Sequence, residues 1–149
     1  MRLVMLYIFL VITIFNYSSI LAQNNTSTID LTITNIRNNK GNIIISMYKS
    51  NADFEDHIFY KKIYVSKCKV KNGTLKHKFN LPPHIYGIAI VDDENSNKKI
   101  DGNFFGIPKE GFGFSNYYHT SLSLPKFPSF KFELKNNTTL KVNIKVRYL

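Results

Sequence analysis

The stretch that decides the fold lies near the C-terminus: Thr139-Leu140-Lys141-Val142-Asn143-Ile144-Lys145-Val146-Arg147-Tyr148. Apolar and polar side chains alternate along it without interruption, and successive side chains of a β-strand point to opposite faces. One face of such a segment packs against a core while the other meets water, which is typical of an antiparallel strand. A period of two at this length predicts a β-protein.

The same signals recur toward the N-terminus. Two β-rich segments flank Asn72-Gly73, a pair that favours the tight turn of a β-hairpin. Only residues 51–57 resemble a helical turn. We therefore predict an all-β fold, a seven-stranded antiparallel Greek-key sandwich of immunoglobulin-like type. The expected strands cover residues 29–33, 41–49, 59–71, 74–80, 85–92, 130–134 and 139–148.

The first residues have the three parts of a secretory signal peptide. Arg2 supplies a positive charge, an apolar run follows from Leu3 to Phe15, and Ala22 offers a small residue for cleavage. The apolar run is shorter than the roughly 20 residues that a transmembrane helix needs. We expect residues 1–22 to be removed, residues 23–149 to form a single β-sandwich domain, and the location to be extracytoplasmic: periplasmic, cell-envelope or secreted.

An acidic loop follows the strand expected at residues 85–92. Asp93, Asn95, Asn97 and Asp101 place side-chain oxygens at relative positions 1, 3, 5 and 9, and Lys99 offers a backbone carbonyl at position 7. A short loop with this spacing can curl around one hard cation. The pattern predicts a calcium site formed by residues 93–101.

Two departures separate this loop from a complete EF-hand. Lys98 stands at position 6, where calcium loops favour Gly, and Phe104 replaces the bidentate Glu at position 12. An ion would need a further ligand, for which Asp92 and Glu110 are candidates. The alternative is a connector without metal, in which the Asp and Asn side chains accept hydrogen bonds from their own backbone.

The next segment, residues 104–119, is rich in aromatic residues and glycine. Exposed aromatics on a loop can stack on sugars or hold a peptide, and Phe112, Phe114, Tyr117 and Tyr118 are the candidates for partner binding. The favoured interpretation is instead a loop that folds back and closes one end of the sandwich, because a long loop must bury its apolar groups.

The chain carries 20 Lys and Arg against 10 Asp and Glu, a net charge of +10. A basic surface favours anionic partners such as envelope polysaccharide, although it also keeps a protein soluble. Cys68, the single cysteine, is expected to be a small buried hydrophobe in a strand. A solvated outer face is expected for the lysines at positions 67, 69, 71, 76 and 78. No catalytic motif is recognisable, so we expect no enzyme, and secretion argues against a nucleic-acid partner.

Two blocks carry a resemblance to a known family. They are LPPHIYGIAIVDDENSNKKID (residues 81–101) and NFFGIPKEGFGFSN (residues 103–116), followed by Pro128-Ser129-Phe130. The chain resembles the domain-of-unknown-function 2141 family of small secreted bacterial proteins. The resemblance implies an extracytoplasmic β-sandwich similar to transthyretin-like and Cna B-type modules, and it implies no established activity. Ser96 and Lys98 stand where that family has glycines.

Two functional hypotheses from different classes follow. The first is a secreted, non-catalytic binding or accessory module of the cell envelope, stabilised by one calcium ion and recognising a polysaccharide or a protein. The second is a hydrolase, or an auxiliary domain of one, that acts on envelope carbohydrate or peptide through residues 104–119. A cluster of Asp101, Glu110 and His119 around an open cleft would favour the second.

Overall fold

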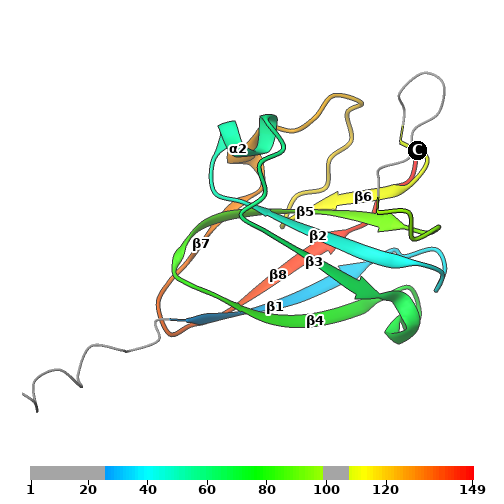
Figure 1. Cartoon of the computed structure of the whole chain (residues 1–149), viewed down its shortest axis with the longest axis horizontal. Helices are drawn as coiled ribbons and strands as arrows, with labels where there is room; N and C mark the ends of the chain where they lie inside the picture. Colours follow the sequence, from blue (N-terminus) through cyan, green and yellow to red (C-terminus); the bar gives the residue numbers. More distant parts are fainter. Residues whose placement is uncertain (1–25, 99–107) are drawn as a thin grey trace, which may run out of the picture.

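The computed structural model describes residues 26–98 and 108–149, and within them the chain forms two β-sheets (Figure 1). The smaller sheet has the strand order β4-β1-β8, with β1 at Ser27–Thr34, β4 at Leu75–Leu81 and β8 at Thr139–Lys145. The larger sheet has the order β3-β2-β5-β6, and β7 also pairs with β5. Its strands are β2 (Asn42–Tyr48), β3 (Lys61–Ser66), β5 (His84–Asp93), β6 (Gly111–Phe114) and β7 (Lys131–Leu134).

The prediction of an all-β, two-sheet protein is confirmed, but two of its details are wrong. Eight strands are present in the described residues rather than seven, because Gly111–Phe114 pairs with β5 as β6 instead of forming a loop. The arrangement is also not wholly antiparallel. The first and last strands pair in parallel, with Ile29 opposite Leu140 and Leu31 opposite Val142.

The main core lies between the two sheets and follows from the alternation in the sequence. On β1 the residues Ile29, Leu31 and Ile33 are completely buried, while the residues between them are only half-buried. Val142 and Ile144 of β8 continue the same inner layer. Burial of one side chain of this size stabilises the fold by roughly 1.5–3 kcal/mol.

The larger sheet differs, because its central strand β2 is buried on both faces. Six of its seven residues are buried, including Ile43 and Ile45 in the main core and Tyr48 in a second aromatic cluster. The cover over the outer face comes from the short helix α2 (Asn51–Glu55) and from the chain around the 3₁₀ turn η3 (Phe127–Ser129), as Figure 1 shows.

The turn predicted at Asn72-Gly73 is present, but the strands on either side of it do not pair with each other, so the predicted hairpin is wrong. Both residues have positive φ angles, 49° and 68°, as a type I′ turn requires. Lys71 and Thr74 close the turn with two backbone hydrogen bonds of 2.9 Å. However, β3 pairs with β2, whereas β4 pairs with β1. The turn therefore belongs to a crossover between the two sheets.

The crossover also corrects two predictions about single residues. The strand expected to continue to residue 71 ends at Ser66, and a 3₁₀ turn η2 covers Lys67–Lys69. This turn rotates Lys67 into the protein, where it is completely buried, and leaves Cys68 exposed. Lys67 was expected in solvent and Cys68 in the core, so both predictions are wrong. Lysines 69, 71, 76 and 78 are exposed as expected.

Candidate functional site

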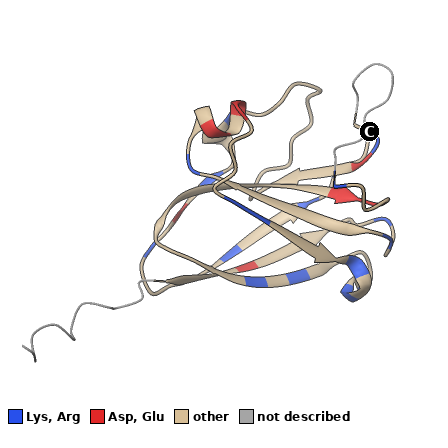
Figure 2. Ribbon diagram, viewed as in Figure 1, with Lys and Arg blue, Asp and Glu red and all other residues tan. Residues whose placement is uncertain are grey.

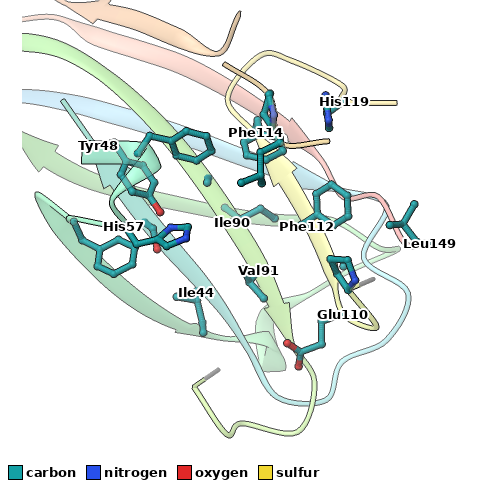
Figure 3. A pocket seen from close by; sticks show the side chains of 18 of the residues that line it. Ile44, Tyr48, His57, Ile90, Val91, Glu110, Phe112, Phe114, His119 and Leu149 are labelled. Carbon is teal, nitrogen blue, oxygen red and sulfur yellow. The ribbon is translucent and has the colours of Figure 1, made fainter. Parts of the chain in front are cut away.

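A cavity of about 240 Å³ lies on the outer face of the larger sheet (Figure 3). Its lining is mostly aromatic and aliphatic and comes from β2, β5 and β6, from α2 and from the segment after β6. The lining includes Tyr48, Ala89, Glu110, Phe112, Phe114 and His119. Concave, largely apolar sites with a few polar groups are the usual form of small-molecule sites in proteins.

Strand geometry explains which residues reach this face. Ile44, Ser46 and Tyr48 alternate along β2 with the core residues Ile43 and Ile45, so they point away from the core. Ala89 opposes Ser46 in the register of β2 and β5. Because Ala89 and Ser46 are small, the sheet leaves open space where a larger pair would fill it.

An aromatic cluster forms one wall of the cavity. It consists of buried rings from four parts of the chain. The ring centroid of Phe54 lies 4.9 Å from that of Phe130 and 6.2 Å from that of Phe114, and both pairs have edge-to-face geometry. Such pairs contribute about 0.5–1.5 kcal/mol beyond the area that they bury. Gly87 makes room for the rings, because a Cβ there would lie 2.5 Å from Phe130.

Ser115 fastens the segment after β6 to the sheet. Its hydroxyl accepts a hydrogen bond from the backbone N–H of Ile88 at 3.0 Å and donates one to the carbonyl of Phe130 at 2.5 Å. Ser115 is completely buried. A single hydroxyl thus joins β5, the end of β6 and the turn before β7, and it sets the position of the aromatic wall.

His119 is the most distinctive polar group of the cavity. Only 7% of the residue is exposed, and its Nε2 contacts the carbonyl oxygen of Ser123. A carbonyl can only accept, so Nε2 carries a proton, and in the neutral imidazole Nδ1 then presents a lone pair. Among the described residues Nδ1 has no hydrogen-bond partner, although it is buried. A ligand with an O–H or N–H group could supply that partner.

The four residues proposed for partner binding separate into two pairs. Phe112 and Phe114 on β6 line the cavity. The sequence indicated only that residues 104–119 are rich in aromatic side chains that could bind a partner. Tyr117 packs against the aromatic cluster, and Tyr118 is 47% exposed beside Lys145.

Glu110 is buried and also lines the cavity. His119 was named with Glu110 as a possible cleft residue, and both line the cavity. The contribution of Tyr48 was missed; the continuous apolar run Ile43-Ile44-Ile45, typical of a strand buried on both faces, is the signal that could have indicated it.

The acidic loop begins where β5 ends. One carboxylate oxygen of Asp93 accepts a hydrogen bond from the backbone N–H of Asn97 at 3.1 Å, and the other accepts one from the backbone N–H of Lys98 at 3.0 Å. Asn95 also accepts from the N–H of Asn97. These are the Asx hydrogen bonds expected of a connector. Ser96 and Lys98 have φ angles of 60° and 63°, the strain expected at these non-glycine positions.

Two of the predicted calcium ligands, Lys99 and Asp101, lie outside the described residues. Asp92 is held by other partners, because one oxygen lies 2.5 Å from Lys67 Nζ and the other 2.5 Å from the hydroxyl of Tyr148. Within residues 26–98 and 108–149, no group of three His, Cys, Asp or Glu side chains is close enough to hold a metal ion.

A second charged pair lies beside the acidic loop. Arg37 donates two hydrogen bonds to the carboxylate of Glu94, at 2.6 and 2.8 Å. The hydrogen bond from Arg37 lowers the pKa of Glu94 below its ordinary value, and partial burial opposes this shift. The guanidinium also lies 4.3 Å from the ring centroid of Tyr148.

Lysines recur along β4 and β8 of the three-stranded sheet (Figure 2). Exposed lysines from β4 and β8 surround a shallow polar depression there, lined by Asp30, Thr32, Lys76, Lys78, Lys141 and Asn143. Asp30 is the one acidic residue of this lining, 3.4 Å from Lys78. We call this surface the lysine face. Its charge suits an extended anionic ligand.

The fold and the cavity define a small two-sheet β-protein with an apolar, ligand-sized cavity outside its larger sheet. The model of the family described as "Uncharacterized protein conserved in bacteria (DUF2141)" matches residues 31–141, so the chain belongs to this family and the resemblance is confirmed. Comparisons with curated proteins and with solved structures gave no match. Among the helices described, none is long and apolar enough to cross a membrane.

Proposed function

We propose that this protein is an extracytoplasmic, non-catalytic binding module of the cell envelope whose ligand enters the cavity beside β6. The observation that carries the proposal is the cavity itself, mostly apolar and held by a rigid strand pair and an aromatic wall. The signal-peptide pattern of residues 1–22 supports the location. Two packed sheets agree with a transthyretin-like or immunoglobulin-like module, which we propose as the finer fold class.

The size and polarity of the cavity limit the ligand. A dry cavity of about 150 Å³ accepts benzene, and sites for drug-sized ligands begin near 300 Å³. A volume of about 240 Å³ therefore suits one ring or a short alkyl group. The buried Nδ1 of His119 calls for a hydrogen-bond donor on that group. A phenolic ring, as in a Tyr side chain of a partner protein, satisfies both conditions.

Phenol tests this site directly, and methoxybenzene is its control because it has a similar ring without the donor. We expect phenol to shift the methyl NMR signals of Ile44 and Val91, which line the cavity, at millimolar concentration, and methoxybenzene to bind at least several-fold more weakly. Ala89→Leu fills the cavity and should abolish the shifts, whereas Thr32→Leu on the opposite sheet should keep them. Shifts that persist in Ala89→Leu, or no shifts in the wild type, would refute the proposed site.

We also propose that the lysine face contacts anionic envelope polysaccharide. Support comes from the exposed lysines of β4 and β8 and from the net charge of the chain. Such binding weakens with salt, because the screening length is about 8–10 Å at 0.10–0.15 M ionic strength. Replacing Lys76, Lys78 and Lys141 together with Gln should remove binding to a heparin column at low salt, while Lys61→Gln on β3 should have a small effect.

A calcium ion in the acidic loop is a further proposal. Asp93 is completely buried at the start of the loop, and a carboxylate oxygen has capacity for a cation beside its backbone hydrogen bonds. Residues 93–101 have the required spacing. The ion would remove the repulsion between neighbouring acidic groups and fix the end of β5.

One observation favours the hydrolase alternative. Glu110 and His119 line the same cavity, and a carboxylate with an imidazole is a common acid–base pair. Hydrolysis of nitrophenyl esters and glycosides by the wild type and by Glu110→Gln separates the two functions. Turnover that the variant loses would replace the binding proposal with an enzymatic one.

A further inference from the structure

One row of paired residues crosses the outer face of the larger sheet and lines the cavity from end to end. Along it Lys62 of β3 pairs with Ser46 of β2, Ser46 with Ala89 of β5, and Ala89 with Phe114 of β6. Residues that oppose each other on neighbouring strands share one face of a sheet. The two central side chains are small. The row is therefore a trough with a long cationic side chain at one end and an aromatic ring at the other.

Larger groups border the trough on both sides. Ile44 and Val91 oppose each other in the next row of the same face, and both line the cavity. On the other side Gly87 has no side chain, and the rings of Phe127 and Phe130 occupy the space where its Cβ would lie, at 2.7 and 2.5 Å. A ligand longer than one ring therefore has room along the row, across the strands, and not along them.

The hydrogen-bond acceptor of the cavity lies at the β6 end of the row. The ring centroid of His119 is 5.9 Å from that of Phe114, in edge-to-face geometry, and Figure 3 shows the two side chains next to each other. The buried Nδ1 of His119, which has no hydrogen-bond partner among the described residues, calls for a donor. The hydroxyl of a bound phenol therefore belongs at this end.

A cation lies at the opposite end. Lys62 is exposed at the rim of the cavity, and its Nζ lies 3.7 Å from the ring centroid of Phe59, which lines the same cavity. In the part of the chain that the structure describes, the ion pairs join other residues and leave this ammonium without a carboxylate. It is therefore available to an anionic group of a ligand, and charged hydrogen bonds of this kind are the stronger ones.

The charged groups around the row favour an anion at Lys62. Glu110 is the one carboxylate side chain of the described lining, and it stands four positions before Phe114, about 13 Å along the strand at 3.3 Å per residue. The acidic residues of α2 do not line the cavity. Lys98 does line it, but its Nζ lies 5.8 Å from the ring centroid of Tyr64, which belongs to the neighbouring row.

We propose that the ligand of the cavity is a small phenolic acid that lies along this row, with its hydroxyl at His119 and its carboxylate at Lys62. The inference rests on the proposed function, because it names the ligand of the same cavity. Neighbouring strands are about 4.8 Å apart, so three spacings separate Lys62 from Phe114 by about 14 Å. The ring fills the cavity, and a short arm carries the carboxylate over Ser46 to the rim. A Tyr side chain within a protein has no carboxylate there, so the small acid is the better fit.

A pair of matched ligands tests this inference. The acid para-hydroxyphenylpropionate carries the carboxylate, and para-hydroxyphenylpropionamide has nearly the same shape without the charge. Methyl NMR titrations that follow Ile44 and Val91 measure both Kd values, at an ionic strength of about 0.15 M, where distant charges are screened. We expect the wild type to bind the acid about two- to fivefold more tightly than the amide, which is the usual effect of one exposed charge pair.

Variants of the exposed lysines assign the preference to one residue. Lys62→Gln should remove the preference for the acid, and Lys62→Arg should retain it. Lys61→Gln is the matched control, because Lys61 is exposed but opposes the core residue Met47 and so lies on the other face of β3. This variant should bind both ligands as the wild type does.

Two results would overturn the inference and leave the proposed function standing. The first is equal affinity of the wild type for the acid and the amide while phenol still binds, which would remove the carboxylate from the ligand. The second is loss of the preference in Lys98→Gln but not in Lys62→Gln, which would refute the orientation along the row. Failure of the proposed function is distinguishable from both, because phenol itself would then produce no shifts.

Discussion

Tyr148 donates its hydroxyl proton to Asp92 Oδ2 across 2.5 Å, and through this contact the last residues of the chain meet the end of β5. Asp92 in turn lies 2.5 Å from the buried amine of Lys67. Burial, followed by the hydrogen bond to Asp92, raises the pKa of Tyr148 well above its ordinary value. The phenol therefore stays protonated and remains a donor. One carboxylate thus joins the C-terminal segment, the larger sheet and the crossover.

The first prediction concerns the buried amine. Lys67→Met should lower the free energy of unfolding by about 3–5 kcal/mol, because it leaves Asp92 buried without its cationic partner. Lys69→Met, two residues away and exposed, should change it by less than about 0.5 kcal/mol. Urea denaturation followed by circular dichroism measures both. Equal stability of the two variants would show that the buried contact contributes nothing.

The second prediction concerns Ser115. Ser115→Ala removes the partner of a buried N–H on Ile88 and of a buried carbonyl on Phe130, and each unsatisfied group costs about 1–3 kcal/mol. We expect destabilisation of at least about 2 kcal/mol. Thr120→Ala, at an exposed neighbouring position, is the matched control and should be nearly neutral. A mild effect of Ser115→Ala would mean that the segment before β7 is held mainly by its aromatic rings.

The third prediction concerns calcium. If the acidic loop binds the ion with a Kd near 10⁻⁴–10⁻³ M, wild-type protein should be stabilised by up to about 2.7 kcal/mol at a hundredfold excess over Kd. This corresponds to a rise of several degrees in Tm over the value in chelator. Asp93→Ala should lose the calcium-dependent rise, whatever its starting Tm. Glu133→Ala, which removes an exposed carboxylate on β7, should keep it. Identical wild-type curves in chelator and calcium would leave the loop as a metal-free connector.

The fourth prediction concerns pH. The hydrogen bond from Arg37 lowers the pKa of Glu94 in the folded state, so the unfolded chain binds the proton at a higher pH. The stabilisation from this pair is present above the ordinary Glu pKa of about 4.3 and is lost as the pH falls through the lower folded value. The pair is partly exposed, so its contribution is about 0–1 kcal/mol. Glu94→Gln should be less stable than wild type at pH 7, and the difference should shrink by pH 3. Glu133→Gln, which lacks this ion pair, should show no such convergence.

Local signals indicated most of the strands correctly. The alternation around Ile29 and Val142 predicted β1 and β8, because one buried face requires a period of two. Asn72 and Gly73 predicted a turn with positive φ, because few other pairs accept that conformation. The sequence also indicated positive φ at Lys98. These features depend on residues close to one another in the chain.

Other features depended on partners that local patterns do not identify. The segment Gly111–Phe114 resembles a loop by composition, and it becomes strand β6 because Ala89 to Asp92 offer a free edge. Whether the chain after Gly73 returns to its own sheet or crosses to the other depends on which edge is open. The cavity likewise requires β2, α2 and the segment around His119 to meet.

The sequence by itself determined that the chain is a β-protein with alternating faces, a tight turn at residues 72–73 and an oxygen-rich loop after residue 92. Each of these follows from the φ preferences and side-chain periods of neighbouring residues. Only the tertiary structure decided that β1 and β8 run parallel, that Lys67 is buried against Asp92 and Asn38, and that an apolar cavity lies beside β6. The physical reason is that burial and ion pairing depend on which distant segments pack together, and a lysine has the same local preferences in solvent as in a core.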